Sequence, residues 1–255
     1  LEELLGERVV LSDEEREARV ILRENLRFHP EEKKNDDEFA KKLASEADIY
    51  CNNAFGTAHR EHASMIAVPN AMVDKPKVAG MLLAKELQYL DQAIDQANRP
   101  FIAVLGGAKV SDKMGAIEHL LGKVDTILIG GAMAYTFLAA QGVEVGDSLV
   151  EDDRTEDAMS MMRIANSSTT DVLLPKDHIC TQDVQVDSMT KVVTGSIPKG
   201  WMGVDIGPET IESYSKCIQV GRTIVWNGPM GIFEKKPFEN GTRAIALAMA
   251  TATEG

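Results

Sequence analysis

The sequence has few cysteines, no long hydrophobic run and no recognisable targeting segment. Among 255 residues there are three cysteines, Cys51, Cys180 and Cys217, which are far apart and form no C-x-x-C pair. A disulfide framework or a cysteine metal site is therefore not expected, and a reducing compartment suits the chain better. The longest mostly apolar stretch, 126–140, is shorter than the ~20 residues that a membrane helix needs. The first residues, LEELLGERVV, are acidic and unlike a signal peptide.

Positive charge is also scarce in the sequence. It has 27 Lys and Arg against 40 Asp and Glu, a formal net charge of -13. Such an excess repels nucleic acids and anionic membrane surfaces, so neither is expected as a partner. A small anionic ligand is still compatible, provided that basic residues gather around it. Two nucleotide signatures are missing as well, the P-loop motif GxxxxGK[ST] and the dinucleotide fingerprint GxGxxG.

Short apolar segments alternate with longer amphipathic segments along the chain. Continuous apolar runs predict strands covered on both faces at 19–22, 48–51, 101–105, 126–129, 171–174 and 223–226. Helical spacing predicts helices at 36–47, 78–94, 112–121, 154–164, 208–215 and 241–249. This alternation is typical of an α/β fold with parallel sheets. The long helix from Val78 could connect two domains or simply cover a sheet, and its periodicity does not distinguish these roles.

Four glycine-rich segments are placed at the ends of predicted strands. They are LGGAKVSDK from residue 105, IGGAM from 129, WMGVDIGP from 201 and WNGPMGIFE from 226. Ligands of open parallel sheets bind beyond the carboxyl ends of the strands, where glycine lets them approach the backbone. One such loop is usually a plain turn. Four of them on one face of one sheet favour a nucleotide site with an apolar floor and a phosphate end.

Polar residues in these loops have candidate roles. Lys109 and Lys113 can both reach a polyphosphate, although on this stretch alone a solvated helix face explains them equally well. Asn227 can offer its amide to phosphate oxygens. Glu234 can accept hydrogen bonds from ribose hydroxyls. For Asn227 and Glu234 in isolation, a rigid turn with a surface glutamate is the better explanation.

A second group of candidates lies in the front half of the chain. Arg27 follows one predicted strand in ENLRFHP, and Arg60 follows the next in NNAFGTAHREHAS, flanked by His59 and His62. Two arginines and two histidines at successive strand ends suit a small anion with carboxylate and phosphate groups. The alternative is a pair of surface arginines with structural histidines, and for His62 that alternative is preferred.

Taken in order, these motifs resemble the phosphoglycerate kinase family. The segments ENLRFHPEEKKND, AFGTAHREHAS, GMLLAKELQYL, GGAKVSDK, LIGGAMAYTFL, GWMGVDIGP and VWNGPMGIFE appear in that family's order and span nearly the whole chain. The resemblance implies an α/β fold of two Rossmann-like parallel-sheet domains joined by a long interdomain helix. It implies a 3-phosphoglycerate domain at 1–77, the helix at 78–95 and a nucleotide domain at 96–255.

The resemblance also implies an activity and its residues. The family transfers a phosphoryl group reversibly between ATP and 3-phosphoglycerate in glycolysis, giving ADP and 1,3-bisphosphoglycerate, with Mg²⁺ accompanying the nucleotide. We therefore expect a cytoplasmic, monomeric kinase in which Arg27, Arg60 and His59 bind the acid and Lys113 acts on the transferred group. The residues expected at the nucleotide are Gly106, Gly107, Ala108, Lys109, Lys113, Gly130, Gly131, Gly203, Val204, Asn227, Gly228, Pro229 and Glu234.

The chain departs from the family pattern at both ends. The opening motifs RVDFNVP and HLGRP are absent, as is the closing GGGD[ST] loop with its Mg²⁺-binding aspartate, so no metal ligand is expected here. The stretch LSDEEREA between Val10 and Arg19 is also short. We expect a fragment, or a sequence assembled from observed residues, that is inactive alone; a natural truncated paralogue is the other possibility. A non-catalytic nucleotide-binding or interaction module is an alternative function. A dinucleotide oxidoreductase is disfavoured by the missing fingerprint.

Overall fold

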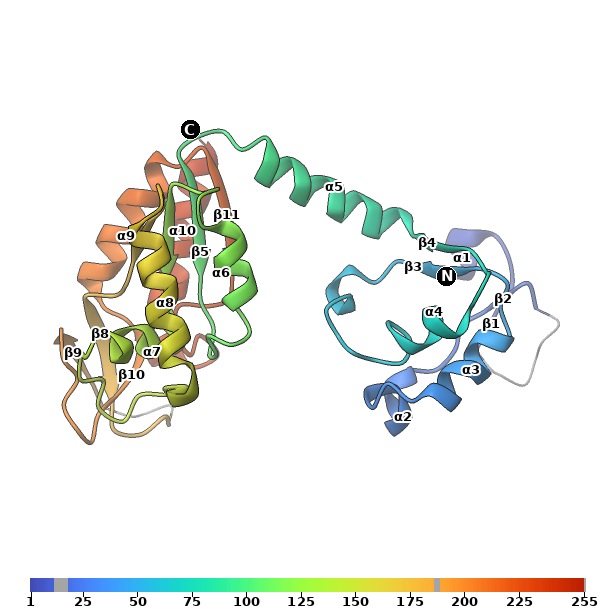
Figure 1. The fold of residues 1–255 in the computed structure, drawn as a ribbon, viewed down its shortest axis with the longest axis horizontal. Coiled ribbons are helices and arrows are strands. Elements are labelled where there is room, and N and C mark those ends of the chain that lie inside the picture. The colour runs from blue at the N-terminus through green and yellow to red at the C-terminus, as the bar shows by residue number, and fades with distance from the viewer. Residues whose placement is uncertain (12–17, 186–188, 255) are drawn as a thin grey trace. The chain divides into compact units, whose positions relative to one another are not determined.

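The computed structural model describes residues 1–11, 18–185 and 189–254, and at 90–93, 95 and 254 it describes the backbone alone. The protein divides into two compact units, Leu1–Gln92 (unit 1) and Ala93–Gly255 (unit 2), both drawn in Figure 1. Most of the predicted short stretch between Val10 and Arg19 lies outside the described residues. None of the helices in the described ranges is long and apolar enough to cross a membrane.

Unit 1 is built from short elements around a small core. Its elements are α1 (Glu2–Leu5), β1 (Val9–Val10), β2 (Val20–Ile21), η1 (Leu26–Phe28), α2 (Pro30–Lys33), α3 (Asp37–Ser45), β3 (Tyr50–Asn52), η2 (Phe55–Thr57), α4 (Ala67–Ala71) and β4 (Lys77–Ala79). The strands pair in parallel, β1 with β2 and β3 with β4. The core between α3 and α4 consists mainly of alanines, with Val68 and Met72. Small side chains bury little apolar area, so this core is modest.

The helix α5 (Met81–Asp95) crosses the boundary between the two units. The sequence predicted its start at Val78, which is wrong by three residues because Lys77–Ala79 form β4. The Asn53 side-chain oxygen accepts a hydrogen bond of 2.8 Å from the Leu82 backbone N–H. This contact satisfies one of the backbone donors that the first turn of a helix leaves without an intrahelical partner.

Unit 2 contains a four-stranded parallel sheet in the order β11-β5-β6-β7. Its strands are β5 (Phe101–Leu105), β6 (Thr126–Ile129), β7 (Asp171–Leu173) and β11 (Thr223–Asn227). Each agrees with a predicted strand to within one residue. All three pairings are parallel. Thr223 of β11 pairs with Phe101 of β5, and Ile102 of β5 pairs with Thr126 of β6. The α/β fold class with parallel sheets is thereby confirmed.

Helices cover both faces of this sheet (Figure 1). They are α6 (Met114–Leu120), α7 (Met133–Ala140), α8 (Thr155–Asn166), α9 (Pro208–Val220) and α10 (Asn240–Glu254), with short turns η3 (Asp152–Arg154) and η4 (Lys236–Phe238). Side chains of β5 alternate between two cores. Phe101, Ala103 and Leu105 pack with α6, α7 and α8, whereas Ile102 and Val104 pack with α9 and α10. Burial on both faces explains why the strand is continuously apolar.

The sequence patterns did not predict α7 or a second sheet. Residues 133–138 of α7 are all buried, so the helix has no polar face and no amphipathic period. The second sheet is antiparallel, with order β10-β8-β9 and strands β8 (Asp177–Thr181), β9 (Thr190–Thr194) and β10 (Met202–Ile206). The segment WMGVDIGP was therefore assigned wrongly as a loop at an end of the parallel sheet, because most of it forms β10.

Candidate active site

Three loops at the carboxyl ends of β5, β6 and β11 hold one another through backbone hydrogen bonds. Gly106 N donates to the Asn227 carbonyl, Gly107 N to that of Pro229 and Gly131 N to that of Met230, each at 2.9 Å. The carboxyl ends of parallel strands meet at one edge of a sheet, so the order of β11, β5 and β6 brings these loops together. Segments about 100 residues or more apart in the sequence thus form one rim.

Glycine is required in this rim for two separate reasons. Gly107 and Gly131 have φ angles of 111° and 68°, a region that residues with a side chain rarely adopt. A Cβ atom on Gly131 would also lie 2.4 Å from the carbonyl oxygen of Gly107. The two loops could not approach this closely with any larger residue.

A cavity of about 380 Å³ opens beside this rim. Its volume lies within the ~300–1,000 Å³ typical of small-molecule sites. Seven residues expected at a nucleotide line it, namely Gly107, Ala108, Gly131, Gly203, Val204, Pro229 and Glu234. Most of the other lining residues are apolar, and these were not singled out from the sequence: Ala132, Tyr135, Leu149, Val184, Met202, Asp205, Met230, Gly231 and Ile232. β10 supplies one wall, so WMGVDIGP reaches the site as a strand of the second sheet.

The other predicted nucleotide residues lie behind or beside the cavity. Gly106 and Gly130 pack against the WNGPMG loop, where an added Cβ would lie 2.1 Å from the Pro229 oxygen and 2.5 Å from the Met230 sulfur. Gly228 has a φ angle of 91° and turns that loop. These three glycines shape the rim and do not line the cavity. Lys109, Lys113 and Asn227 also lie outside the cavity lining.

Tyr135 forms part of the cavity wall, and the sequence analysis did not identify it as a site residue. The residue is 4% exposed, and burial raises the pKa of its hydroxyl far above the usual value. A Cβ on Gly203 would lie 1.9 Å from the Tyr135 oxygen, so the tyrosine requires glycine at this position of β10. The only signal in the sequence was the position of Tyr135 within LIGGAMAYTFL.

Asp205 is a buried carboxyl group on the same cavity wall. It is 2% exposed and accepts hydrogen bonds from Gly241 N at 2.6 Å and Ile206 N at 2.9 Å. Burial raises the pKa of Asp205 to about 7, while the two backbone donors oppose that rise. The Gly241 contact ties β10 to the start of α10, so Asp205 links a wall of the cavity to the helix that covers the sheet.

Lys113 and Asn227 meet next to the cavity rim. Lys113 Nζ donates to Asn227 Oδ1 at 2.6 Å, which joins the loop after β5 to the end of β11. The helix α6 begins at Met114 and not at the predicted Asp112. Lys109 and Lys113 therefore belong to the turn between β5 and α6, which disagrees with a solvated helix face for the pair. Lys109 is exposed in this turn.

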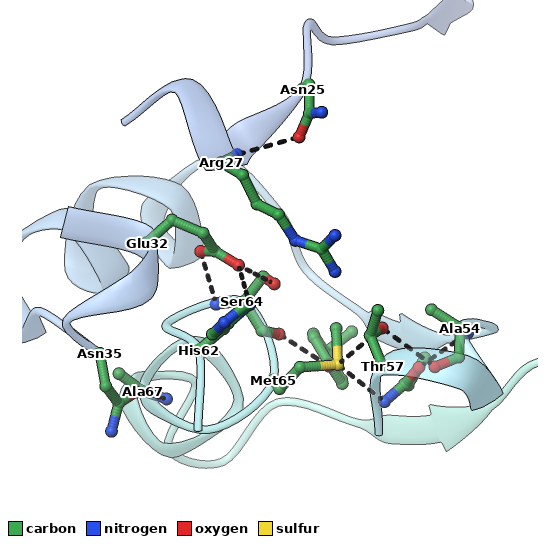
Figure 2. Close-up of polar contacts among 12 residues, drawn as sticks. Asn25, Arg27, Glu32, Asn35, Ala54, Thr57, His62, Ser64, Met65 and Ala67 are labelled. Carbon is green, nitrogen blue, oxygen red and sulfur yellow. Dashed lines mark hydrogen bonds and ion pairs between the residues drawn. The ribbon is translucent and has the colours of Figure 1, made fainter. Parts of the chain in front are cut away.

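The candidate anion residues of unit 1 lie at exposed turns. Arg27, His59 and Arg60 are all exposed. Arg27 N donates to Asn25 Oδ1 at 3.0 Å, and the Arg27 side chain extends away from that contact in Figure 2. Within the described part of unit 1, no hydrogen bond or ion pair joins these three side chains. Their shared role with the acid stays a prediction.

His62 lies next to a buried carboxylate. Its side chain is 17% exposed, with Nδ1 3.8 Å from Glu32 Oε1. Glu32 also accepts hydrogen bonds from Ser64 N at 3.0 Å and Ser64 Oγ at 2.6 Å, as Figure 2 shows. These contacts join α2 to the loop before α4. They agree with the structural role that the sequence favoured for His62.

The described residues contain no group of three or more His, Cys, Asp or Glu side chains that could hold a metal ion. A site made of protein ligands alone therefore does not fit this part of the chain. Mg²⁺ in phosphoryl-transfer enzymes is commonly held through substrate phosphates with only one or two carboxylates. None of the described residues is therefore assigned as a Mg²⁺ ligand.

The doubly covered parallel sheet, with its cavity at the carboxyl ends of the strands, places the protein among Rossmann-like α/β proteins. The model of the family described as "Phosphoglycerate kinase" matches residues 1–255. The chain belongs to the phosphoglycerate kinase family.

Individual relatives agree with this assignment. The chain is 52% identical over 238 residues to the phosphoglycerate kinase of Chlorobium phaeobacteroides (strain BS1), covering 93% of this chain and 59% of the relative. It is 48% identical over 265 residues to that of Anaeromyxobacter sp. (strain K), covering 99% and 66%. The solved phosphoglycerate kinase of Coxiella burnetii superposes with a TM-score of 0.76 at 36% identity, covering 98% and 66%. The chain thus spans about three fifths to two thirds of the length of these relatives.

Proposed function

We propose that the whole protein catalyses reversible phosphoryl transfer between ATP and 3-phosphoglycerate, giving ADP and 1,3-bisphosphoglycerate. Family membership supports this reaction, and the geometry of unit 2 supports its nucleotide half. The observation that carries the proposal is the Lys113–Asn227 contact beside an apolar cavity rimmed by Gly107 and Gly131. A purine base suits the apolar wall. The lysines and Asn227 suit the phosphates.

The proposed nucleotide pose follows from the positions of the charged and apolar groups. The base contacts Val204 and Gly203 on one wall, and the ribose hydroxyls donate to the exposed carboxylate of Glu234. The phosphates extend along the rim toward Lys109 and Lys113. Phosphoryl transfer needs positioning and charge stabilisation more than covalent catalysis. Lys113 supplies positive charge to the transferred group, and Asn227 orients the ammonium group of Lys113.

The acid is assigned to unit 1. Arg27 and Arg60 offer planar guanidinium groups that suit carboxylate and phosphate oxygens, with His59 adjacent. Their exposure leaves them accessible to a small anion. Mg²⁺ is assigned to the nucleotide phosphates and to none of the described residues.

We also place the enzyme in the cytoplasm, as part of glycolysis. Cys51, Cys180 and Cys217 are free thiols, which agrees with a reducing compartment.

A coupled assay of the intact protein tests the proposal. With ATP, Mg²⁺ and 3-phosphoglycerate, formation of 1,3-bisphosphoglycerate is followed by its reductive consumption in a second enzymatic step. We expect turnover that depends on 3-phosphoglycerate. ATP consumption without the acid, or none with it, would contradict the proposed reaction.

A further inference from the structure

The turn that carries the two phosphate lysines is anchored by a distant carboxylate. Glu151 lies 40 residues beyond Ser111, which sits between Lys109 and Lys113. Its Oε1 accepts a hydrogen bond from Ser111 Oγ at 2.6 Å, and its Oε2 accepts one from Ser111 N at 3.0 Å. The two oxygens thus hold the backbone and the side chain of one residue. Such bidentate contact restrains both the position and the orientation of the turn.

The backbone of Glu151 is held at a second point. Its N–H donates to Thr136 Oγ1 at 3.1 Å, and Thr136 is 1% exposed on α7. This helix follows the loop that contains Gly131, on the rim of the cavity. Leu149, two residues before Glu151, lines the cavity itself. The segment 149–151 therefore extends from the proposed base site to the lysine turn.

The carboxylate of Glu151 is ionised at neutral pH. Partial burial alone raises its pKa, but hydrogen bonds from Ser111 and Val110 N, together with the charge of Lys109, hold the pKa below its usual value. Hydrogen bonds to an ionised acceptor are roughly twice as strong as neutral ones. The anchor is consequently a strong contact despite its partial exposure.

The lysine turn is held on both sides of Ser111, and Val110 within it is fully buried in the core of unit 2. Gly107 N bonds to the Pro229 carbonyl at one end, and Lys113 N bonds to the Val110 carbonyl near the other. Between these points the Ser111–Glu151 contact joins the turn to a separate segment. A displacement of ~1 Å in a positioning group can lower a rate about 10²-fold. The Ser111–Glu151 contact therefore helps to set the orientation of Lys109 and Lys113, together with the hydrogen bond from Lys113 Nζ to Asn227.

We propose that Glu151 is a positioning residue that holds the 109–113 turn at a fixed place relative to the base cavity, so that both lysines meet the nucleotide phosphates. The inference rests on the proposed nucleotide site and deepens it. Glu151 itself carries negative charge and is not assigned to touch the phosphates. Its effect passes through Ser111 on one side and Thr136 on the other.

Calorimetry with ADP and with adenosine separates this role from a merely structural one. We expect Glu151→Ala in the intact protein to weaken ADP binding by about 10-fold, the scale of losing hydrogen bonds to a charged group. Adenosine, which lacks phosphates, should bind within about 2-fold of the wild type. Glu151→Gln keeps one acceptor oxygen and should recover part of the ADP affinity. An unchanged ADP affinity, or equal losses for ADP and adenosine, would overturn the inference.

Two further variants keep the test decisive if Glu151→Ala does not fold. Ser111→Ala removes only the hydroxyl donor. It should weaken ADP binding but not adenosine binding, by a smaller factor than Glu151→Ala. Glu156→Gln, an exposed glutamate of α8, is the matched control and should leave both affinities unchanged. Equal ADP affinity in Ser111→Ala and wild type would count against the anchor.

Failure of the inference is distinguishable from failure of the proposed function. If the wild type binds ADP but does not turn over 3-phosphoglycerate, the reaction is wrong while the ratio of ADP to adenosine affinity still tests Glu151. If the wild type turns over and Glu151→Ala leaves that ratio unchanged, the inference alone is wrong.

Discussion

The two units bury their strands to very different extents. All five residues of β5 in unit 2 are buried, between helices on both faces of the sheet. In unit 1 all three residues of β4 are exposed, and the core beside α3 and α4 is mostly alanine. In unit 2 the loops at the strand ends are joined by backbone hydrogen bonds, and seven of the thirteen nucleotide candidates line one cavity. The candidate residues of unit 1 lie on short turns, and no hydrogen bond or ion pair joins their side chains in the described part of the chain.

Buried carboxylates show how each unit secures its loops. In unit 1, Glu32 anchors Ser64. In unit 2, Asp177 is 2% exposed and accepts bonds from Glu209 N, Thr210 N and Thr210 Oγ1 at the start of α9. A buried acceptor that is fully hydrogen-bonded stabilises the local structure, and its loss leaves donors without partners. Loop positions in both units thus depend on single carboxylates from distant segments.

Removing one large ring from each core tests the difference in packing most directly. Phe137 is fully buried in unit 2, so Phe137→Ala should lower the free energy of unfolding by ~3–5 kcal/mol, the usual cost of such a cavity. Phe39 is partly buried beside the alanine-rich core of unit 1. Phe39→Ala should cost about half as much, because less apolar contact is lost.

Tryptophan fluorescence and circular dichroism measure these two effects. Both tryptophans of the sequence, Trp201 and Trp226, lie in unit 2, so their fluorescence follows the unfolding of that unit. In urea titrations, tryptophan fluorescence gives the free energy of unfolding of unit 2, and circular dichroism follows the loss of secondary structure in both units. The two variants are compared with wild type by both measurements. Equal destabilisation by Phe39→Ala and Phe137→Ala would show that the core of unit 1 is packed as well as that of unit 2.

Lys113 tests whether the rigid rim of unit 2 is catalytic. If Lys113 stabilises charge on the transferred group, Lys113→Ala should lower kcat by ~10²-fold or more, the scale of losing one preorganised electrostatic contact. ATP affinity should fall less. Steady-state kinetics of the intact protein measure both quantities. The matched control is Lys216→Ala, whose side chain is 70% exposed and paired with Glu212 on α9. An unchanged kcat for Lys113→Ala would leave Lys113 with a structural role only, as the partner of Asn227.

The arginines test the assignment of the acid to unit 1. Arg27→Ala and Arg60→Ala should each weaken 3-phosphoglycerate binding by ~10-fold or more, since charge-assisted hydrogen bonds are lost. ADP binding should stay nearly intact, because its proposed site lies in unit 2. Calorimetry with each ligand decides the matter, with Arg19→Ala, an exposed arginine paired with Glu7, as the control. Comparable losses of ADP binding would show that the two substrates are not divided between the units.

The last comparison concerns the pH dependence of unit 2 stability. The folded pKa of Asp205 is about 7, above its usual value of 3.8, so between these values the folded state holds a proton that the unfolded state has released. Asp205 therefore contributes a loss of stability as pH rises from about 4 to 7. His178 acts in the opposite direction between pH 4 and 6.5, because burial lowers its pKa to about 4.

The stability difference between wild type and Asp205→Asn separates the contribution of Asp205 from that of His178. Relative to wild type, Asp205→Asn should gain stability between pH 5 and pH 8, as measured by urea unfolding with tryptophan fluorescence. Asparagine keeps an acceptor oxygen for Gly241 N and does not titrate. A stability difference that is the same at both pH values would show that Asp205 does not titrate in this range.

Part of the fold and of the site was predictable from local sequence. Continuous apolar runs predicted the four parallel strands of unit 2, because burial on both faces demands apolar residues at every position. Glycine pairs marked the rim, since positive φ angles and close loop contacts select glycine, as at Gly107 and Gly131. The two lysines and Asn227 were candidates from the same loops, and the structure joins Lys113 to Asn227.

Other features depended on the tertiary structure because they arise between segments far apart in sequence. The buried helix α7 has no amphipathic period. The sequence of β10 resembles a glycine-rich loop, and only its pairing with β8 identifies it as a strand. Tyr135, Leu149 and Asp205 reach the cavity only when both sheets are packed. Glu151 carries no local signal at all, since its role depends on Ser111, 40 residues away. The sequence by itself determined the parallel strands of unit 2, the glycine turns and the charges available, because those follow from local sterics and apolar periodicity. Only the packed structure decided which of these groups meet, because strand order and sheet packing bring distant segments within bonding distance.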